Sequence, residues 1–412
     1  MPTIRLLEHE KLTIHPDEFG RSITSLQFEK LCQFNDKNDN KYFTVIRNGI
    51  KVANYVGVIQ IGNLVIEILP KADKIELRKE NKEESFQQWR NVLLKMLKIS
   101  GNLKIDSVSE SMLKKRFNSL LDLYFEIYLT EVSLLIRNGL VKKYRNDSAN
   151  IKALKGRINF SKNIQVNLIH QERFYTTHQC YDYEHLINQI LLKGLNILRL
   201  ITNDESIISR INKLLFAFPE IQEISIDEAS FDNVNLNRKT EVYSEALKIA
   251  RMLILNYSPD ISNGEDDMIA LLFDMNALWE KYIYKRLKQG EDGTYTVNYQ
   301  EEVEFWEKRV INPDLVIRKD GEIIIVDTKW KLVEPDKPSD DELKQMYSYN
   351  LNWAARKSIL LYPGAGNKKD GIYGKFHKGY VNGHYCKVGF IDVLNERGEL
   401  NMDVAGQVLK KI

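Results

Sequence analysis

The chain has 412 residues, of which 43% are hydrophobic and 28% charged, and its formal net charge is +2. This length is too great for one ordinary domain and predicts two or three, and the composition is that of a globular protein with ample material for a core. A net charge so close to zero excludes a uniformly basic surface, so any nucleic-acid-binding surface must be a local patch.

The three cysteines, Cys32, Cys180 and Cys386, lie far apart with no Cys-x-x-Cys motif. That spacing argues against a disulfide framework, a zinc site or a four-cysteine iron–sulfur cluster, and it favours a reduced, cytoplasmic environment. The N-terminal segment MPTIRLLEHEKLTIH has no apolar signal-peptide core. No run approaches the roughly 18 apolar residues of a membrane span, so we expect no membrane partner.

Residues 1–80 are predicted to form a β-rich domain. The stretch FTVIRNGIKVANYVGVIQIGNLVIEILPK consists of short β-branched runs separated by the turn signals Asn48-Gly49 and Gly62-Asn63. The charge-dense segment ADKIELRKENKEES follows and marks the expected domain boundary.

Residues 81–262 are predicted to be mainly helical. Several segments place apolar residues at three- and four-residue steps, as the buried face of a helix requires. They are SFQQWRNVLLKMLKIS, SLLDLYFEIYLTEVSLLIRNGL, YEHLINQILLKGLNILRLI and KTEVYSEALKIARMLILNY. The second helix is expected to end at Gly139, and we interpret the apolar stripes as the core of a bundle.

Residues 263–412 change character and predict a mixed sheet flanked by helices. In chain order we expect a helix over EDDMIALLFDMNALWEKYIYKRLKQ, strands over YTVNYQEEVEFWEK and NPDLVIRKDGEIIIVD, a helix over SDDELKQMYSYNLNWAA capped by Ser339 or Asp340, and a strand over KSILLYP. This order suits a small α/β domain, so the expected fold class is multi-domain α+β.

Asp320-Gly321, between two β-type runs, predicts a two-residue hairpin loop. The loop fixes the register of the two strands and places Asp314 directly across from Asp327, with Cβ atoms roughly 4.5–5.5 Å apart. Two carboxylates this close repel each other unless a cation lies between them, and hard oxygen ligands suit magnesium or manganese.

Lys329 is two residues beyond Asp327, so both side chains share one face of the strand, while Thr328 is expected to point the other way. Such a face offers acids that can hold a metal and a lysine that can stabilise negative charge on a phosphate. The alternative is an ordinary hairpin with a charged end. Neighbouring features favour a site: Glu280 lies on the preceding predicted helix, and Gln345 and Tyr349 share one face of the following helix.

These residues resemble the core motif of the PD-(D/E)xK nuclease superfamily. The Pro-Asp pair ending at Asp314 and the Asp-Thr-Lys triplet ending at Lys329 match its central signature. QMYSY matches the Gln-x-x-x-Tyr element of its RecB-like branch, and Glu280 stands where the superfamily has a helix acid. The resemblance implies a C-terminal endonuclease domain.

A wider resemblance, to the McrC family, spans nearly the whole chain. It is carried by YVGVIQIGNLVIEILPKAD, LKGRINFSKNI and LNRKTEVYSEALKIARMLI. McrC is the nuclease subunit of McrBC modification-dependent restriction systems, so the resemblance implies a partner: a hexameric AAA+ GTPase of the McrB type that recognises modified cytosine in double-stranded DNA. In the family the N-terminal region docks in the motor's central pore. Lys71 and Arg157 lie in family-like motifs, although Lys71 also fits an exposed lysine after a buried strand.

We therefore expect Mg²⁺-dependent hydrolysis of DNA phosphodiesters, with Mn²⁺ as a substitute. The metal ligands implied are Asp314, Asp327, Glu280 and the backbone carbonyl of Thr328. Lys329 would orient the attacking water or neutralise the transition state, and Gln345 and Tyr349 would position the scissile strand or the lysine.

The sequence has no GxxxxGK[ST] loop, so we expect this chain to bind no nucleotide itself; GAGNKKDG at 364–371 lacks that spacing. Two other functions remain open from the sequence. One is an autonomous RecB- or Cas4-like nuclease, which the missing cysteine quartet disfavours. The other is a non-catalytic activator of the motor, which the intact acidic and lysine set disfavours.

Overall fold

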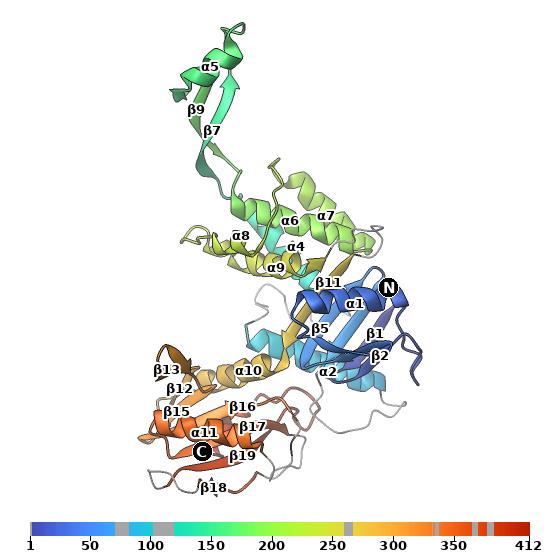
Figure 1. Cartoon of the computed structure of the whole chain (residues 1–412), viewed down its shortest axis with the longest axis vertical. Helices are drawn as coiled ribbons and strands as arrows, with labels where there is room; N and C mark the ends of the chain where they lie inside the picture. The colour runs from blue at the N-terminus through green and yellow to red at the C-terminus, as the bar shows by residue number, and fades with distance from the viewer. Residues whose placement is uncertain are drawn as a thin grey trace. The chain divides into compact units, whose positions relative to one another are not determined.

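The computed structural model describes residues 2–70, 82–101, 119–258, 267–331, 333, 338–364, 370–376 and 383–412 (Figure 1). The chain divides into two compact units, each built from separate stretches of sequence. Unit 1 comprises Met1–Ile59, Leu64–Ile105 and Leu272–Ile412, and unit 2 comprises Gln60–Asn63 and Asp106–Leu271. The first and last predicted ranges thus share one unit, whereas the division into three domains stays a prediction.

The N-terminal part is rich in strands, as predicted. The elements are β1 (Thr3–Leu7), β2 (Lys11–Thr13), α1 (Ser25–Lys37), β3 (Phe43–Ile46), β4 (Gly49–Val52), β5 (Tyr55–Ile61), β6 (Leu64–Leu69) and α2 (Lys82–Ile99). Strand β1 runs parallel to β6, and β2, β4 and β3 form a small antiparallel sheet. Asn48 and Gly62 occupy turns with φ of 58° and 52°, which confirms both turn predictions. Lys71 lies outside the described residues.

A six-stranded mixed sheet forms the C-terminal part of unit 1, with strand order β12-β15-β16-β17-β19-β18. The elements are α10 (Met275–Gln289), β12 (Tyr295–Tyr299), β13 (Val303–Trp306), β14 (Arg309–Ile311), β15 (Leu315–Lys319), β16 (Glu322–Thr328), α11 (Asp340–Asn352), β17 (Lys357–Gly364), β18 (Gly374–Lys375), β19 (Tyr385–Asp392) and α12 (Val404–Leu409). Strands β16, β17 and β19 run parallel, and β12, β15 and β18 run antiparallel to their neighbours.

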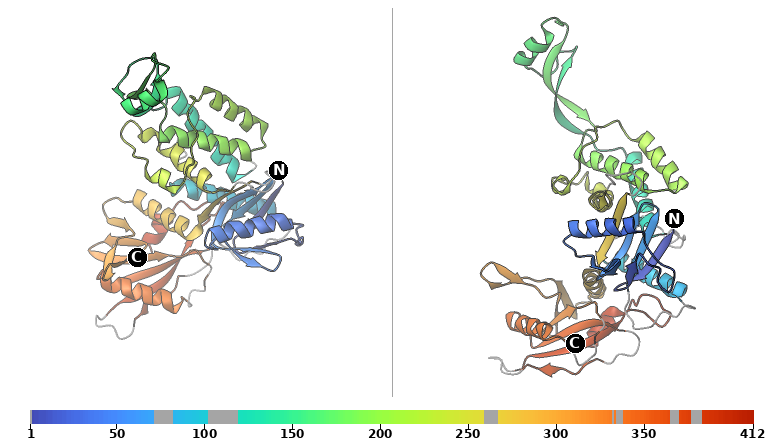
Figure 2. Two further views of the ribbon diagram at one scale, coloured as in Figure 1. Left: turned by 45° about the horizontal axis from the view of Figure 1, so that its top comes forward. Right: turned by 45° about the vertical axis from the view of Figure 1, so that its right-hand side comes forward.

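Helix α11 packs on β16, β17 and β19, as both views of Figure 2 show. Met346 of the helix and Trp353 at its C-cap are buried in one apolar cluster with Ile325 of β16 and Leu360 of β17. Ser339 caps the helix, since its side chain accepts a hydrogen bond from the backbone of Glu342, which confirms the predicted cap. The middle of β16 is therefore held in an apolar core, and its C-terminal end carries the predicted acids.

One prediction in this region was wrong in part. The segment predicted as a single helix begins with a strand, β11 (Met268–Asp274), and only then continues as α10. Residues 268–271 are all buried, as in a short strand with core on both faces. The helix starts where Asp274 accepts hydrogen bonds from the backbone of Asn276 and Ala277, so a capping residue inside the apolar run sets the boundary.

Of the predicted helices, α4 (Leu120–Asn138), α6 (Leu186–Ile201) and α9 (Ser244–Leu255) lie in unit 2, whereas the first, α2, belongs to unit 1. Unit 2 also contains α7 (Glu205–Ala217), α8 (Glu228–Asp232) and a short strand, β10 (Tyr257–Ser258). Helix α4 ends at Gly139, as predicted, with the C-cap N–H donating to Ile136. Helices α4, α6, α7 and α9 pack against one another and bury their apolar faces.

A long polar hairpin interrupts these helices and was not predicted. Strands β7 (Lys143–Ile151) and β9 (Phe174–Asp182) pair antiparallel, with β8 (Arg157–Ile158) beside β9 and α5 (Phe160–Asn167) in the connection. No residue of β7 is buried, so the strand lacks the alternating apolar pattern by which a strand is recognised in sequence. Arg157, singled out in the sequence, lies in β8 and is exposed. Among the described residues, we find no helix with the length and apolar content needed to cross a membrane.

The contribution of the β15–β16 turn to stability can be tested by mutation. Asp320 and Gly321 have φ of 52° and 79°. We expect Gly321→Ala to lower the free energy of unfolding by about 1–2 kcal/mol, because an alanine in the left-handed region is strained. The matched control is Gly374→Ala in β18 of the same sheet, where the added Cβ would meet its nearest atom at an ordinary 3.7 Å. Urea titrations of both variants measure the difference, and equal midpoints would contradict the prediction.

A candidate metal centre at the end of strand β16

The predicted register of the central hairpin is confirmed. Leu315 pairs with Val326 and Lys319 with Glu322, so Asp314 and Asp327 are the next pair beyond the ladder. Asp327 is only 1% exposed, and Asp314 is half-buried. Burial and the neighbouring charge of Asp314 raise the pKa of Asp327 to about 7, and burial also raises the pKa of Asp314.

Lys329 faces these acids as expected from its spacing. Its Nζ lies 2.8 Å from Oδ2 of Asp327, and its backbone N–H donates to the carbonyl of Leu361 in β17. Burial lowers the pKa of the Lys329 ammonium, but the carboxylates of Asp327 and Asp314 outweigh that effect and raise it. The lysine therefore stays charged beside the acids.

Thr328 departs from the prediction that its side chain points away from the acids. Its hydroxyl donates to Oδ2 of Asp314 at 2.8 Å, and its backbone N–H donates to the same oxygen at 2.6 Å. The ladder with β15 ends two residues before Thr328, at the pair of Leu315 and Val326, so the Asp314 carboxylate takes the place of a strand acceptor. The proposed role of the Thr328 carbonyl as a metal ligand stays a prediction.

Glu280 of α10 adds a third carboxylate to the group. The side chain is 9% exposed, and its Oε1 accepts a hydrogen bond of 2.7 Å from Nε2 of Gln300. Burial and the charge of Asp314 raise the pKa of Glu280 to about 7. The influence of Asp314 on Glu280, and of Glu280 on Asp327, shows that the three acids lie within electrostatic reach of one another.

Gln300 is a residue of this centre that the sequence did not reveal. It follows β12 with an unusual φ of 45°, and its backbone N–H donates to the carbonyl of Asp314 at 3.0 Å while its side chain holds Glu280. Glutamine is not a residue that favours the left-handed region, and a single polar residue after a strand is not distinctive. We find no sequence signal that would have identified it.

Gln345 and Tyr349 share a face of α11, as predicted, and contact each other. Nε2 of Gln345 donates to the Tyr349 hydroxyl at 2.8 Å, and that hydroxyl donates to the carbonyl of Asn312 at 3.0 Å. Burial and the charge of Asp327 raise the pKa of Tyr349 to about 12. The pair thus stands next to the acids and braces the chain two residues before Asp314.

Trp330 anchors the segment that follows the acids. Its indole Nε1 donates to Oε2 of Glu8 at 2.8 Å, its backbone N–H donates to the side chain of Asn276 at 3.0 Å, and its ring lies 5.2 Å from that of Trp279. These contacts join the N-terminal strand region, helix α10 and the end of β16 within unit 1. They fix Lys329 from its C-terminal side.

The residue types suit a divalent cation. Asp314, Asp327 and Glu280 are buried or half-buried with raised pKa values, and the Lys329 ammonium pairs with Asp327, so negative charge is incompletely neutralised in a poorly solvated place. Carboxylate oxygens are the ligands that Mg²⁺ and Mn²⁺ prefer. The arrangement can hold such an ion and leave Lys329 beside it.

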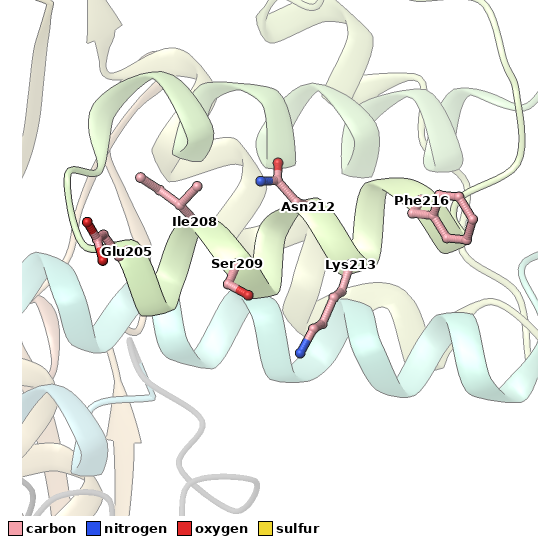
Figure 3. A pocket seen from close by; sticks show the side chains of 6 residues that line it. All are labelled: Glu205, Ile208, Ser209, Asn212, Lys213 and Phe216. Carbon is pink, nitrogen blue, oxygen red and sulfur yellow. The ribbon is translucent and has the colours of Figure 1, made fainter.

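A shallow hollow on α7 of unit 2 offers no comparable chemistry. It is lined by residues three or four apart on one helix face (Figure 3): Glu205, Ile208, Ser209, Asn212, Lys213 and Phe216. A single carboxylate, without a second acid among these side chains, gives a divalent ion little to bind. The end of β16 is the stronger candidate centre.

The comparisons with known proteins agree with the resemblance found in the sequence. Type IV methyl-directed restriction enzyme EcoKMcrBC of Escherichia coli strain K12 is 23% identical over 231 residues, which are 52% of this chain and 65% of that protein. The match therefore spans less than two thirds of that relative's length.

Two solved structures share the fold. One is McrC bound to McrB AAA+ hexamers of Thermococcus gammatolerans, with a TM-score of 0.69 and 20% identity over 100% of both chains. The other is the cryo-EM structure of the McrBC complex of that organism, with a TM-score of 0.51 and 20% identity over 69% of this chain and 86% of that one. The family model described as McrBC 5-methylcytosine restriction system component matches residues 50–363, which include every acid of the candidate centre. Because this match covers most of the chain, the protein belongs to the McrBC 5-methylcytosine restriction system component family.

Proposed function

We propose that this chain is the nuclease subunit of a McrBC-like restriction system and hydrolyses DNA phosphodiesters with the help of Mg²⁺. The observation that carries the proposal is the group of Asp314, Asp327 and Glu280, with Lys329 paired to Asp327, at the end of a buried strand. A purely structural ion pair would need one acid for one lysine. The surplus of carboxylates is what a metal-dependent phosphodiesterase requires.

Each residue of the cluster has a role in this proposal. Asp314, Asp327 and Glu280 would hold Mg²⁺, and the Thr328 carbonyl would add a further oxygen. The ion supplies an activated water and neutralises charge on the scissile phosphate. Lys329, held 2.8 Å from Asp327, would carry its positive charge to the phosphate oxygens or orient the water. Gln345 and Tyr349 would position the Asp314 segment and the scissile DNA strand relative to Lys329.

The proposed partner is a hexameric AAA+ GTPase of the McrB type. Its support is the fold shared over the full chain with an McrC that is bound to such hexamers. The proposed substrate is double-stranded DNA containing methylated cytosine, because the family is described by 5-methylcytosine and the curated relative is methyl-directed. In this division of labour the partner reads the modification and hydrolyses GTP, and this chain stimulates it and cuts, in the cytoplasm.

Cleavage assays with matched variants test the proposal. We expect Asp327→Asn and Lys329→Ala to reduce cutting of methylated plasmid by at least about 100-fold, in a mixture with the motor, GTP and Mg²⁺. The first removes a charged ligand of the proposed ion, and the second removes the positive charge proposed to act on the phosphate. The matched controls are Asp341→Asn and Lys344→Ala, an exposed acid–lysine pair 3.1 Å apart on α11. Both controls should cut at the wild-type rate, and all four variants should bind the motor.

The outcomes of this assay distinguish a motor-dependent nuclease from an autonomous nuclease and from a non-catalytic activator. Methylation-dependent cutting that needs the motor and is lost in Asp327→Asn supports the proposal. Cutting by the chain alone would instead establish an autonomous nuclease. If the motor's GTPase were stimulated while Asp327→Asn cut as well as wild type, the chain would be a non-catalytic activator and the centre would need another explanation.

The pKa values of the acids predict how stability depends on pH without metal. Asp327 and Glu280 bind protons in the folded chain up to about pH 7 but, when unfolded, only up to their ordinary values of 3.8 and 4.5. The folded state therefore holds more protons between about pH 4 and pH 7, and stability must fall as pH rises through that window. In EDTA we expect Asp327→Asn to be more stable than wild type at pH 8, by on the order of 2 kcal/mol, and to lose this advantage near pH 4.

Magnesium should reverse the effect, because the ion stabilises the charged carboxylates. Adding Mg²⁺ at pH 8 is expected to raise the melting temperature of wild type but not that of Asp327→Asn. Differential scanning fluorimetry with and without EDTA measures both. An equal response of the two proteins to Mg²⁺ would show that these acids do not hold the ion.

A further inference from the structure

A second group of metal-ligating side chains lies in the β7–β9 hairpin of unit 2. Asp147 is directly opposite His178 in the antiparallel pair, and Cys180 follows His178 by two residues on the same face. One ligand atom from each of these residues lies within 4.8 Å of the other two, and all three residues are half-buried. The described part of the chain thus brings a thiol, an imidazole and a carboxylate together on one strand pair.

We propose that Asp147, His178 and Cys180 form a binding site for a Zn²⁺-class cation. Zinc takes sulfur, nitrogen and oxygen ligands in tetrahedral geometry, with ligand distances near 2.0–2.3 Å, and side chains already this close need only small rotations to reach them. Three protein ligands leave the fourth position to water or to a partner's side chain. A thiolate and an imidazole favour this cation over Mg²⁺, so the site differs in chemistry from the three carboxylates of the nuclease centre.

Two neighbouring side chains contact the proposed ligands. Arg145, opposite Cys180, lies 3.3 Å from Asp147 and 3.0 Å from Asp182, so its positive charge is shared between two carboxylates. Charged neighbours of this kind orient a ligating carboxylate. Nδ1 of His178 lies 3.3 Å from the hydroxyl of the buried Thr176, a contact that holds the ring and leaves the other nitrogen for a cation.

The hairpin has a structural need that such a cation would meet. None of the nine residues of β7 is buried, and a strand pair with little buried apolar surface is only marginally stable in water. On the opposite face the strands are joined by the tilted contact between the rings of Tyr144 and Tyr181 and by a hydrogen bond between Ser148 and Thr177. A cation that binds Asp147 of β7 and both His178 and Cys180 of β9 would join the strands on the ligand-bearing face and stabilise their pairing register.

Cobalt substitution tests the site in the full, tag-free chain. A thiolate bound to Co²⁺ gives a near-ultraviolet charge-transfer band that carboxylate sites do not give, so the nuclease centre is silent in this assay. We expect the band in wild type and its displacement by Zn²⁺. Cys180→Ser should abolish it, and His178→Ala and Asp147→Asn should weaken Co²⁺ binding by roughly tenfold or more.

Two control variants distinguish this site from another cysteine and from the three carboxylates at the end of β16. Cys32→Ser, which alters another half-buried cysteine, and Asp327→Asn, which alters the nuclease centre, should both leave the band unchanged. Zn²⁺ should also slow backbone hydrogen exchange in β7 and β9 of wild type but not of Cys180→Ser. Absence of the band in wild type, or its persistence in Cys180→Ser, would overturn the proposal.

Discussion

The burial of carboxylate groups at the end of β16 is the constraint on which the candidate centre depends. Ionised acids lose hydration energy in such a place, and each is held by specific partners. Lys329 pairs with Asp327, the backbone and hydroxyl of Thr328 donate to Asp314, and Gln300 donates to Glu280. These partners supply one full positive charge for three potential negative charges. Burial, together with this imbalance, raises the pKa values of Asp327 and Glu280 to about 7, and a bound divalent ion would favour the charged carboxylates.

The sheet makes this arrangement possible because it holds β16 along its whole length. Val326 and Ile325 are fully buried, β15 and β17 lie on either side, and α11 covers the face that carries Ile325. A strand fixed by apolar packing cannot withdraw its last residues toward water, so Asp327 stays 1% exposed. The indole of Trp330, bound to Glu8, then holds the chain just beyond Lys329. Stability of the core is thus used to keep unfavourable charges in place.

The sequence predicted the parts of this centre that follow from local geometry. The Asp320-Gly321 turn determines the register, and the register determines which acids meet; the spacing of Gln345 and Tyr349 likewise determines a shared helix face. Contacts that depend on side-chain rotation or on distant segments could not be predicted in this way. The hydroxyl of Thr328 turns to Asp314 because the ladder ends there, and Gln300 enters through a left-handed backbone after β12. The β7–β9 hairpin escaped prediction because its polar strands carry no apolar period.

The same limitation explains why cysteine spacing gave no sign of the hairpin cluster. Ligand motifs in sequence record residues that are near one another along the chain, whereas Asp147 and Cys180 are brought together only by the pairing of β7 with β9.

The two clusters also differ in how their charge is arranged. At the end of β16 the acids are buried or half-buried and their negative charge is only partly neutralised, which suits a cation that must act on a phosphate. In the hairpin the proposed ligands are half-buried and contact Arg145 and Thr176, which suits a cation that holds two strands together. Hard oxygen ligands in one place and a thiolate in the other would let a single chain use Mg²⁺ and Zn²⁺ without exchanging them.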